Sequence, residues 1–366
     1  MAMSSSRSSG VFIPAKPSTR ARPGIMLRRL IIHAGMPRAG SSSLQEAVFH
    51  NRVALEAEGL LYPVLGLERA AASELAQVYN HKLLFQSARG LWPTKSFRPL
   101  HAEIAGQIAA SPAGSVMLSY EGWWDPRNHR RLKRTLRVLQ KAVPGLTPEI
   151  AVVVREPMAF IVSLYKLDVL HGRTAENFEA YWPEKLDDSR LDYSTIGDSL
   201  SQFAGTQHVI GFDAAAADGE LVGHVLKMLG LGKVLEAPGL AHVARHHSAG
   251  GACFSNAVVS MVLYAAREHG LRLIAHHRRQ LLPALVKLAQ SPEHAVECAR
   301  LVIPVSAASA AAIAQAAAEE ANPYFTRHFG HPPEPYRHST DQPQSVIGDN
   351  SGLARAILSA ISALKS

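Results

Sequence analysis

The residues with the clearest chemical potential form one glycine-bracketed loop near the start of the sequence. An apolar run, Leu30–Ile32, leads to a loop between Gly35 and Gly40, and Ser41–Ser43 follow it. This order is typical of a strand, a tight turn and the start of a helix, where unpaired backbone N–H groups and the helix dipole attract an anion. Arg38 adds a full positive charge to the loop. The sequence therefore predicts a site for a phosphate or sulfate ester.

The spacing of the two glycines narrows the choice of phosphate loop. Gly35 and Gly40 stand five positions apart, as in the Walker pattern G-x-x-x-x-G-K-[ST], but Ser41 occupies the position of the lysine. The cation lies upstream instead, at Arg38. Because the Walker lysine is missing and no convincing acidic partner for Mg²⁺ is evident, a P-loop nucleotide kinase or NTPase is the weaker interpretation.

A second group of chemically suited residues follows another apolar run. The β-branched stretch 149–154 is long enough for one buried parallel strand, and Arg155 and Pro157 come directly after it. Pro157 suits the first position of a helix, and Ser163 lies about two turns further along that helix. Open α/β sheets bind ligands where a strand ends and a helix begins. The spacing therefore allows Arg155 and Ser163 to meet on one anion.

Together, the two segments resemble the nucleotide-binding motifs of sulfotransferases that use 3′-phosphoadenosine 5′-phosphosulfate (PAPS). The family's 5′-phosphosulfate loop reads roughly G-x-P-K-[TS]-G-[TS]-[TS]-[ST]-L-Q, and its counterpart here is Gly35-Met36-Pro37-Arg38-Ala39-Gly40-Ser41-Ser42-Ser43-Leu44-Gln45. The family's 3′-phosphate motif, R-[DE]-P-x5-S-x-Y, is matched by Arg155, Glu156, Pro157, Ser163 and Tyr165. The resemblance implies that PAPS is the co-substrate and is bound by Pro37, Arg38, Ala39, Gly40, Ser41, Ser42, Ser43, Arg155 and Ser163. It also implies an in-line transfer of the sulfuryl group, for which no metal is required.

Two positions of the loop depart from the family pattern. Arg38 replaces the lysine that acts on the transferred group in the family, and a planar guanidinium is not equivalent to a compact ammonium. Ala39 removes one hydroxyl donor. These departures leave open a second alternative, a non-catalytic protein that binds the nucleotide without turning it over.

The residue that accepts the proton of the acceptor is predicted from a third segment. Residues 114–119 read as a short strand, and Glu121 follows it in a Ser-Tyr-Glu sequence that resembles the S-x-E segment of sulfotransferases with a glutamate base. His81 is the competing base, because other members of the family use a histidine. In the simpler alternative, Glu121 pairs with Arg127 or Arg130, and His81 packs in the core. We favour Glu121, which the resemblance implies is catalytic together with Arg38.

These segments require a sheet that brings several strand ends to one edge. The resemblance implies an α/β fold of three layers with a central, mainly parallel sheet, P-loop-like, and additional C-terminal helices. We expect a basic tail in residues 1–27, the α/β domain with its helical C-terminal part in 28–330, and a linker with a short helix in 331–366. Further strands or helices are predicted at 208–212, 42–57, 221–229, 254–268, 279–289, 313–321 and 353–364.

Composition sets limits on partners and compartment. The net charge of +8 suits anionic ligands, and equally nucleic acid, an anionic polysaccharide or a membrane surface. On the resemblance, we expect a carbohydrate, glycolipid or small-molecule acceptor and no nucleic acid. Cys253 and Cys298 form no C-x-x-C pair, so a reducing, cytoplasmic location is the default. No stretch is apolar for long enough to span a membrane, while a peripheral contact with one stays open.

Three other features have both a functional and a simpler interpretation. The basic run 127–137 either binds an acidic acceptor or forms a solvated helix face, and the second is favoured. Trp123, Trp124, Tyr181 and Trp182 either stack on sugars or, more commonly, complete a core. His242 and His246 have helical spacing for zinc, but no Glu follows His242 to complete H-E-x-x-H, so a metal site is not expected.

Overall fold

The computed structural model describes residues 28–65, 81–82, 84, 97–186, 189–217, 219–245, 255–335, 347 and 351–365. The predicted tail 1–27, Cys253, His246 and most of the predicted linker lie outside the described residues. Within the described part of the chain, none of the helices combines the length and the apolarity needed to cross a lipid bilayer.

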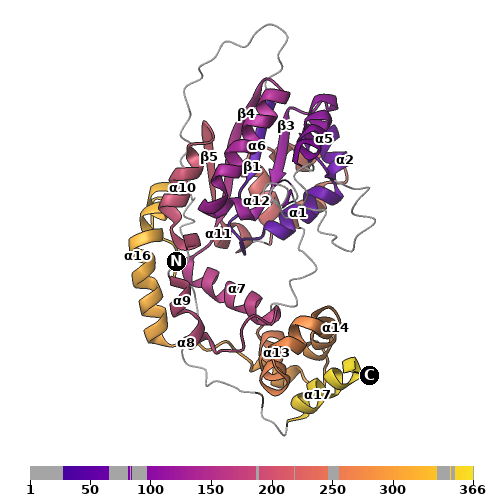
Figure 1. Ribbon diagram of the computed structural model, residues 1–366, viewed down its shortest axis with the longest axis vertical. Helices are drawn as coiled ribbons and strands as arrows, with labels where there is room; N and C mark the ends of the chain where they lie inside the picture. The colour runs from indigo at the N-terminus through magenta and orange to yellow at the C-terminus, as the bar shows by residue number, and fades with distance from the viewer. Residues whose placement is uncertain are drawn as a thin grey trace, which may run out of the picture. The chain divides into compact units, whose positions relative to one another are not determined.

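One sheet of five parallel strands forms the centre of the α/β region (Figure 1). The strands lie in the order β2-β3-β1-β4-β5, so that β1 has β3 on one side and β4 on the other. The three central strands are buried apolar runs, as expected for strands covered on both faces. The strands are β1 (Arg28–His33), β2 (Leu60–Leu61), β3 (Ser115–Ser119), β4 (Leu146–Val154) and β5 (Thr206–Gly211).

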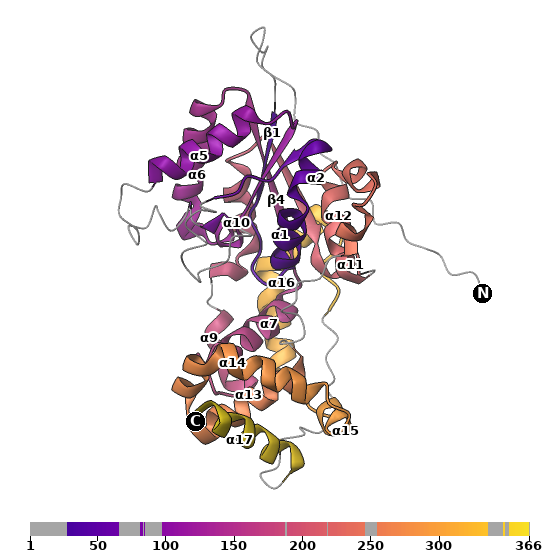
Figure 2. The same cartoon turned by 90° about the vertical axis from the view of Figure 1, so that its right-hand side faces the viewer.

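Helices cover both faces of this sheet (Figure 2). One face carries α5 (Phe97–Ala110), α6 (His129–Ala142) and α10 (Tyr193–Ser201), and the other carries α1 (Ser41–His50), α2 (Arg52–Ala57) and α12 (Leu221–Met228). A short helix, α11 (Phe212–Ala217), follows β5 directly. The predicted three-layer, P-loop-like α/β fold with a parallel sheet and C-terminal helices is therefore confirmed.

Towards the amino ends of the strands, one ionic cluster ties three strands together. Arg29 on β1 donates from Nε and Nη2 to the two oxygens of Glu149 on β4, at 2.7 and 2.8 Å. His208 on β5 lies 2.9 Å from Glu149 Oε2 through its Nε2. Burial alone favours the neutral acid, but the hydrogen bonds from Arg29 and His208 outweigh it and hold the pKa of Glu149 at about 2. This carboxylate is fully engaged and stabilises the sheet.

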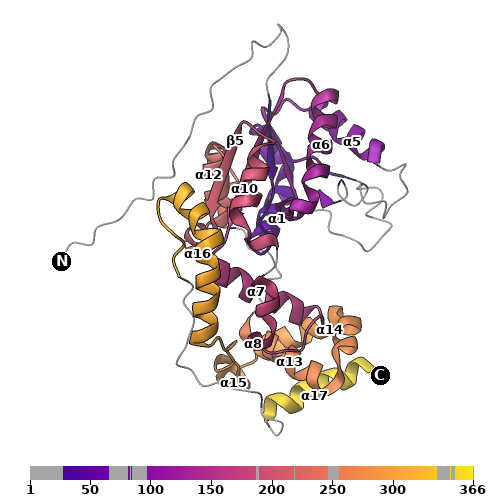
Figure 3. The ribbon, with the colours of Figure 1, turned by 60° about the vertical axis from the view of Figure 1, so that its left-hand side comes forward.

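The chain divides into two compact units, each built from three segments. The first unit contains the sheet and comprises residues 1–155, 192–248 and 320–333; the second comprises 156–191, 249–319 and 334–366. The second unit is helical, and Figure 3 shows α13, α14 and α17 packed together. Its core is apolar, with residues such as Val258, Leu281 and Ile357 fully buried. Its helices are α7 (Pro157–Leu170), α8 (Phe178–Tyr181), α9 (Pro183–Leu186), α13 (Asn256–His269), α14 (Leu271–Ala289), α15 (Ala295–Ala299), α17 (Gly352–Lys365) and most of α16 (Ala307–Phe329).

Several predicted elements have different bounds in the structure. The helix expected over 42–57 is interrupted at Asn51, whose side chain donates to the carbonyl of Ala47 at 2.8 Å and ends α1. Helices α14 and α16 begin earlier than predicted, at Leu271 and Ala307. The simpler interpretation of the aromatic residues is correct for Trp123, Trp124 and Tyr181, which are all buried.

Candidate functional site

Three of the predicted site segments come together at the carboxyl edge of the sheet. The glycine-bracketed loop follows β1, Glu121 comes two residues after β3, and Arg155 comes directly after β4. Because β1 lies between β3 and β4 and all three run in parallel, their ends reach the same edge. The predicted juxtaposition of the loop with the strand that precedes Arg155 is confirmed by the pairing of β1 with β4.

The loop is fixed by main-chain bonds and by two close approaches. The backbone N–H groups of Ala34 and Met36 donate to carbonyls of β4 at 2.8 Å. A side chain at Gly35 would place its Cβ 3.0 Å from the backbone of Glu121, and a Cβ at Gly40 would lie 2.0 Å from Cδ2 of Leu221. Both glycines also have positive φ values, +102° and +77°. The two positions therefore require glycine for space as well as for conformation.

The start of α1 presents the main-chain groups that an anion site needs. Gly40 is the N-cap residue and supplies no side-chain acceptor for the first turn, and no acidic residue lies in that turn. The helix dipole is therefore not compensated by the helix itself. Ser41 is buried and donates to the carbonyl of Met36 at 3.3 Å, whereas Ser42 is exposed. Of the other predicted contacts, Pro37 and Ser43 are half-buried, and Ala39 is fully buried.

Two arginines from different segments meet at the loop. Nη1 of Arg155 donates to the carbonyl of Arg38 at 3.0 Å. The guanidinium of Arg155 also lies over the ring of Phe212, 4.7 Å from its centroid, and its Nε is 3.9 Å from Oδ1 of Asp213. Burial and the charge of Arg155 lower the pKa of Arg38 to about 10, and Glu121 partly opposes this shift. The site therefore holds two cations close together, and the carboxylates of Glu121 and Asp213 offset part of their repulsion.

The carboxylate of Glu121 is held by an amide. Nε2 of Gln45 on α1 donates to Oε2 of Glu121 at 3.1 Å and to the hydroxyl of Ser119 at 3.0 Å. The same hydroxyl lies 2.7 Å from Nδ1 of His33 at the end of β1. Arg127, proposed as one partner of Glu121, pairs instead with Asp125. Glu121 is thus connected to the helix that begins at the loop.

His33 and His81 are both buried, but their surroundings differ. Burial lowers the pKa of each to about 4, so both rings are neutral at pH 7. Nδ1 of His81 accepts from the backbone N–H of Ser119 and its Nε2 donates to the carbonyl of Pro63, both at 2.9 Å. Both ring nitrogens of His81 are therefore used by the main chain. In His33, Nε2 is buried with no hydrogen-bond partner among the described residues.

Ser163 belongs to the second unit. It is buried on α7, which begins at Pro157 as predicted, and Glu156 caps this helix by accepting from the N–H groups of Met158 and Ala159. Tyr165 of the same motif is also buried and donates to the carbonyl of Glu176. The structure thus brings together the loop, Arg155 and Glu121 in the first unit and describes Ser163 with the second.

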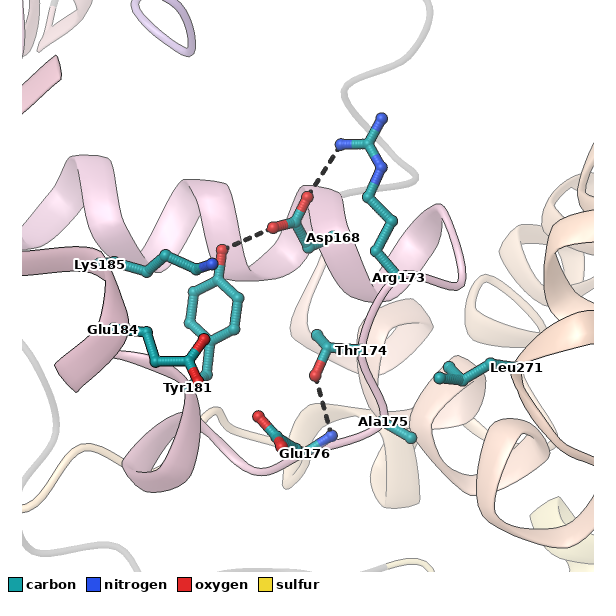
Figure 4. A pocket seen from close by; sticks show the side chains of 9 residues that line it. All are labelled: Asp168, Arg173, Thr174, Ala175, Glu176, Tyr181, Glu184, Lys185 and Leu271. Atoms are coloured by element: carbon teal, nitrogen blue, oxygen red, sulfur yellow. Dashed lines mark hydrogen bonds and ion pairs between the residues drawn. The ribbon is translucent and has the colours of Figure 1, made fainter. Parts of the chain in front are cut away.

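The second unit has a pocket of its own, with a volume of about 690 Å³ (Figure 4). Asp168 accepts from Arg173 at 2.9 Å and from the hydroxyl of Tyr181 at 2.8 Å. The ammonium of Lys185 lies over the ring of Tyr181, 4.8 Å from its centroid. The polar side chains of this pocket largely bind one another. We therefore take the strand ends of the first unit, and not this pocket, as the candidate functional site.

The fold and this edge of the sheet define a parallel α/β protein with a glycine-bracketed loop and a helix start at its strand ends. Compared with models of known protein families, with curated proteins and with solved structures, the chain has no match. The interpretation of the site therefore rests on its own residues.

Sequence reasoning missed several residues that shape the site. His33 and Phe212 received no role, and Ser119 and Gln45 entered only as letters of a motif. A signal for His33 and Ser119 was present, since both stand at the ends of strands. Their contact follows from the register, in which His33 lies directly opposite Ser119.

Proposed function

We propose that the protein is a sulfotransferase that moves a sulfuryl group from PAPS to a hydroxyl or amine of a carbohydrate-like or small-molecule acceptor. The observation that carries the proposal is the meeting of Arg155 with the loop, through the 3.0 Å hydrogen bond from its guanidinium to the carbonyl of Arg38. Two cations, a helix start and a carboxylate then lie within one small region. PAPS carries an anionic group at each end of its ribose, so a site with two separate cations suits it.

The roles of the two arginines follow from charge. Arg38 lies in the loop, where a phosphosulfate would meet the N–H groups of the first turn of α1. Arg155 is a planar fork suited to bidentate binding of the 3′-phosphate. Burial and the charge of Arg155 lower the pKa of Arg38, and an anion bound near both arginines would offset these two effects. Ser163 is proposed as a second donor to the 3′-phosphate on the basis of the motif alone.

The reaction then needs positioning, charge stabilisation and one proton acceptor. The acceptor oxygen forms a bond to sulfur, and the bond between sulfur and the 5′-phosphate oxygen breaks. The departing 3′-phosphoadenosine 5′-phosphate (PAP) takes up negative charge, which Arg38 and the loop stabilise. The proton of the acceptor hydroxyl passes to Glu121. We assign the base to Glu121 because both ring nitrogens of His81 are bonded to the main chain.

Calorimetry with PAP and with ADP tests the nucleotide site. We expect PAP to bind at least about tenfold more tightly, because a charge-assisted bond to the 3′-phosphate is worth about 1.5–3 kcal/mol. Equal affinities would reject the 3′-phosphate site and favour a P-loop nucleotide kinase or NTPase. Transfer of labelled sulfate from PAPS to an extract of candidate acceptors distinguishes an enzyme from a protein that only binds the nucleotide.

A further inference from the structure

Helix α6 presents an exposed face that consists almost entirely of cations. Its fourteen residues include no aspartate or glutamate, and Leu132, Thr135, Leu136 and Leu139 bury its other side. The remaining exposed residues are Gln140 and Ala142. We call the exposed cations the basic face: Arg130, Lys133, Arg134, Arg137 and Lys141.

This arrangement works against the stability of the helix. Each cation of the basic face has another three or four positions away in the sequence, and like charges at these spacings destabilise a helix. Arg130 also lies in the first turn, where the dipole disfavours positive charge and where no acidic residue compensates it. Natural proteins depart from such rules of helix stability mainly at functional sites, so the charge pattern of α6 indicates a function for this face. A polyanion bound to this face would bring negative charge to these cations.

The basic face begins nine residues after the proposed base in the sequence, and hydrogen bonds connect the segment between them to the start of α6. Glu121–Trp124 and Pro126–Asn128 form short 3-10 turns that run directly into α6. The side chain of Asn128 donates to the carbonyl of Gly122, and Nη1 of Arg131 donates to Oδ1 of Asn128 at 3.0 Å. His129 bonds to the carbonyl of Trp123 through Nε2, at 3.1 Å. The first turn of α6 and the residues that follow Glu121 therefore form one hydrogen-bonded segment.

We propose that the basic face of α6 binds an acidic polysaccharide. A lipid surface fits less well, because an interfacial helix presents apolar side chains to the membrane and this face has none. Single-stranded nucleic acid needs aromatic side chains on which bases stack, and this face has none of those either. A row of cations about 16 Å long matches an extended carboxylated chain, which arginine and lysine bind through charge-assisted hydrogen bonds. On the proposed function, this polysaccharide is the acceptor.

The test is binding of polygalacturonate oligomers to the full chain at low salt. A variant with Arg130→Gln, Lys133→Gln and Arg137→Gln should bind on the order of tenfold more weakly, as expected for the loss of three exposed charge contacts. Binding by the wild type should weaken with added salt, because the contacts are screened. Unchanged affinity for PAP shows that the variant is folded.

A matched variant controls for net charge. Arg272→Gln, Arg279→Gln and Lys287→Gln remove the same charge from exposed positions of α14 and should leave binding within about twofold of the wild type. Equal weakening by both variants would overturn the proposal, because net charge alone would then explain the binding. Tighter binding of a DNA duplex or of phosphatidylglycerol vesicles than of polygalacturonate would overturn it in favour of those partners.

The role as acceptor is tested separately with labelled PAPS. We expect label on polygalacturonate with the wild type and much less with the basic-face variant. Equal labelling by both proteins, or none by the wild type, would overturn this role and leave the binding result standing. PAP and ADP could bind equally well while the binding of polygalacturonate still depends on the basic face. The sulfotransferase proposal would then be wrong, and the proposed polysaccharide site would stand.

Discussion

The two ends of the central sheet hold similar charged residues in opposite arrangements. Towards the amino ends, Arg29, Glu149 and His208 bond to one another, and the carboxylate has a pKa of about 2. At the carboxyl ends, burial and the charge of Arg155 lower the pKa of Arg38 to about 10, and the carboxylate of Glu121 accepts from the amide of Gln45. The first end satisfies its charges internally, and the second holds two cations close together with the carboxylates of Glu121 and Asp213 beside them.

At the amino ends the charges stabilise the sheet, and at the carboxyl ends two cations lie beside the loop that we propose as the anion site. A half-buried carboxylate that accepts from an arginine on both oxygens has little left to offer a substrate. Glu121 accepts instead from the uncharged amide of Gln45, and its position after a strand end leaves it next to the loop. His33 also lies at the carboxyl end of the sheet, and its buried Nε2 has no hydrogen-bond partner among the described residues. On the proposed function, the unfavourable electrostatics at this end is the cost of an anion site that is formed before the ligand binds.

The largest effect is expected at the proposed base. Glu121→Gln keeps the shape of the side chain but removes its ability to accept a proton, so turnover should fall by about 10²- to 10⁴-fold. Affinity for PAP, measured by calorimetry, should stay within about threefold, because Glu121 is not a phosphate ligand. Turnover of labelled PAPS that is unaffected by the substitution would reassign the base.

A loss of stability without loss of binding is expected at the opposite end of the sheet. Glu149→Gln leaves Arg29 without its carboxylate and should lower the free energy of unfolding by about 2–3 kcal/mol at pH 7, measured with urea. The pKa of Glu149 is depressed in the folded state from 4.5 to about 2, so its contribution is present above pH 4.5 and is lost as the pH falls towards 2. The difference between the two proteins should therefore shrink on acidification. A difference that is constant with pH would contradict this account.

Arg155→Ala should reduce affinity for PAP by about 10- to 100-fold and affinity for ADP much less. The reason is that only PAP carries the 3′-phosphate assigned to Arg155. Arg155→Lys is the matched control, since it retains the charge but loses the planar guanidinium. Its affinity for PAP should lie between those of the wild type and Arg155→Ala. Equal losses for PAP and ADP would indicate that Arg155 only supports the loop.

The smallest effect concerns the residue that holds the base. Gln45→Met removes the donor to Glu121 with little change in volume, and kcat should fall about tenfold while the KM for PAPS stays unchanged. Gln280→Met, at an exposed position of α14, is the control and should change neither constant. A rise in KM with constant kcat would show that Gln45 acts on the nucleotide and not on Glu121.

Much of the fold could be predicted, because the buried parallel strands are continuous apolar runs. The segments 30–32, 115–119 and 149–154 all lie in strands, and Pro157 starts α7 as expected. The break at Asn51 could not be predicted, because apolar residues continue on both sides of it. Val53, one of those residues, is 75% exposed.

The charged residues of the candidate site could be predicted from the sequence, but the hydrogen bonds that position them could not. Arg38, Glu121 and Arg155 follow from their places after apolar runs. The hydrogen bonds of Gln45 and the contact of His33 with Ser119 depend on strand order and register, which local periodicity does not contain. The two glycines illustrate the same limit. Their spacing was visible, but the contacts with Glu121 and Leu221 that exclude a side chain are tertiary.

The division of the chain into interleaved segments has a practical consequence. The peptide bond between Arg155 and Glu156 is one of several points at which the backbone passes from one unit to the other. Neither unit corresponds to a contiguous stretch of sequence, so neither can be expressed by simple truncation at one end. Fragments cut at such a crossing would each carry pieces of two cores, and we expect them to regain a native state only when mixed.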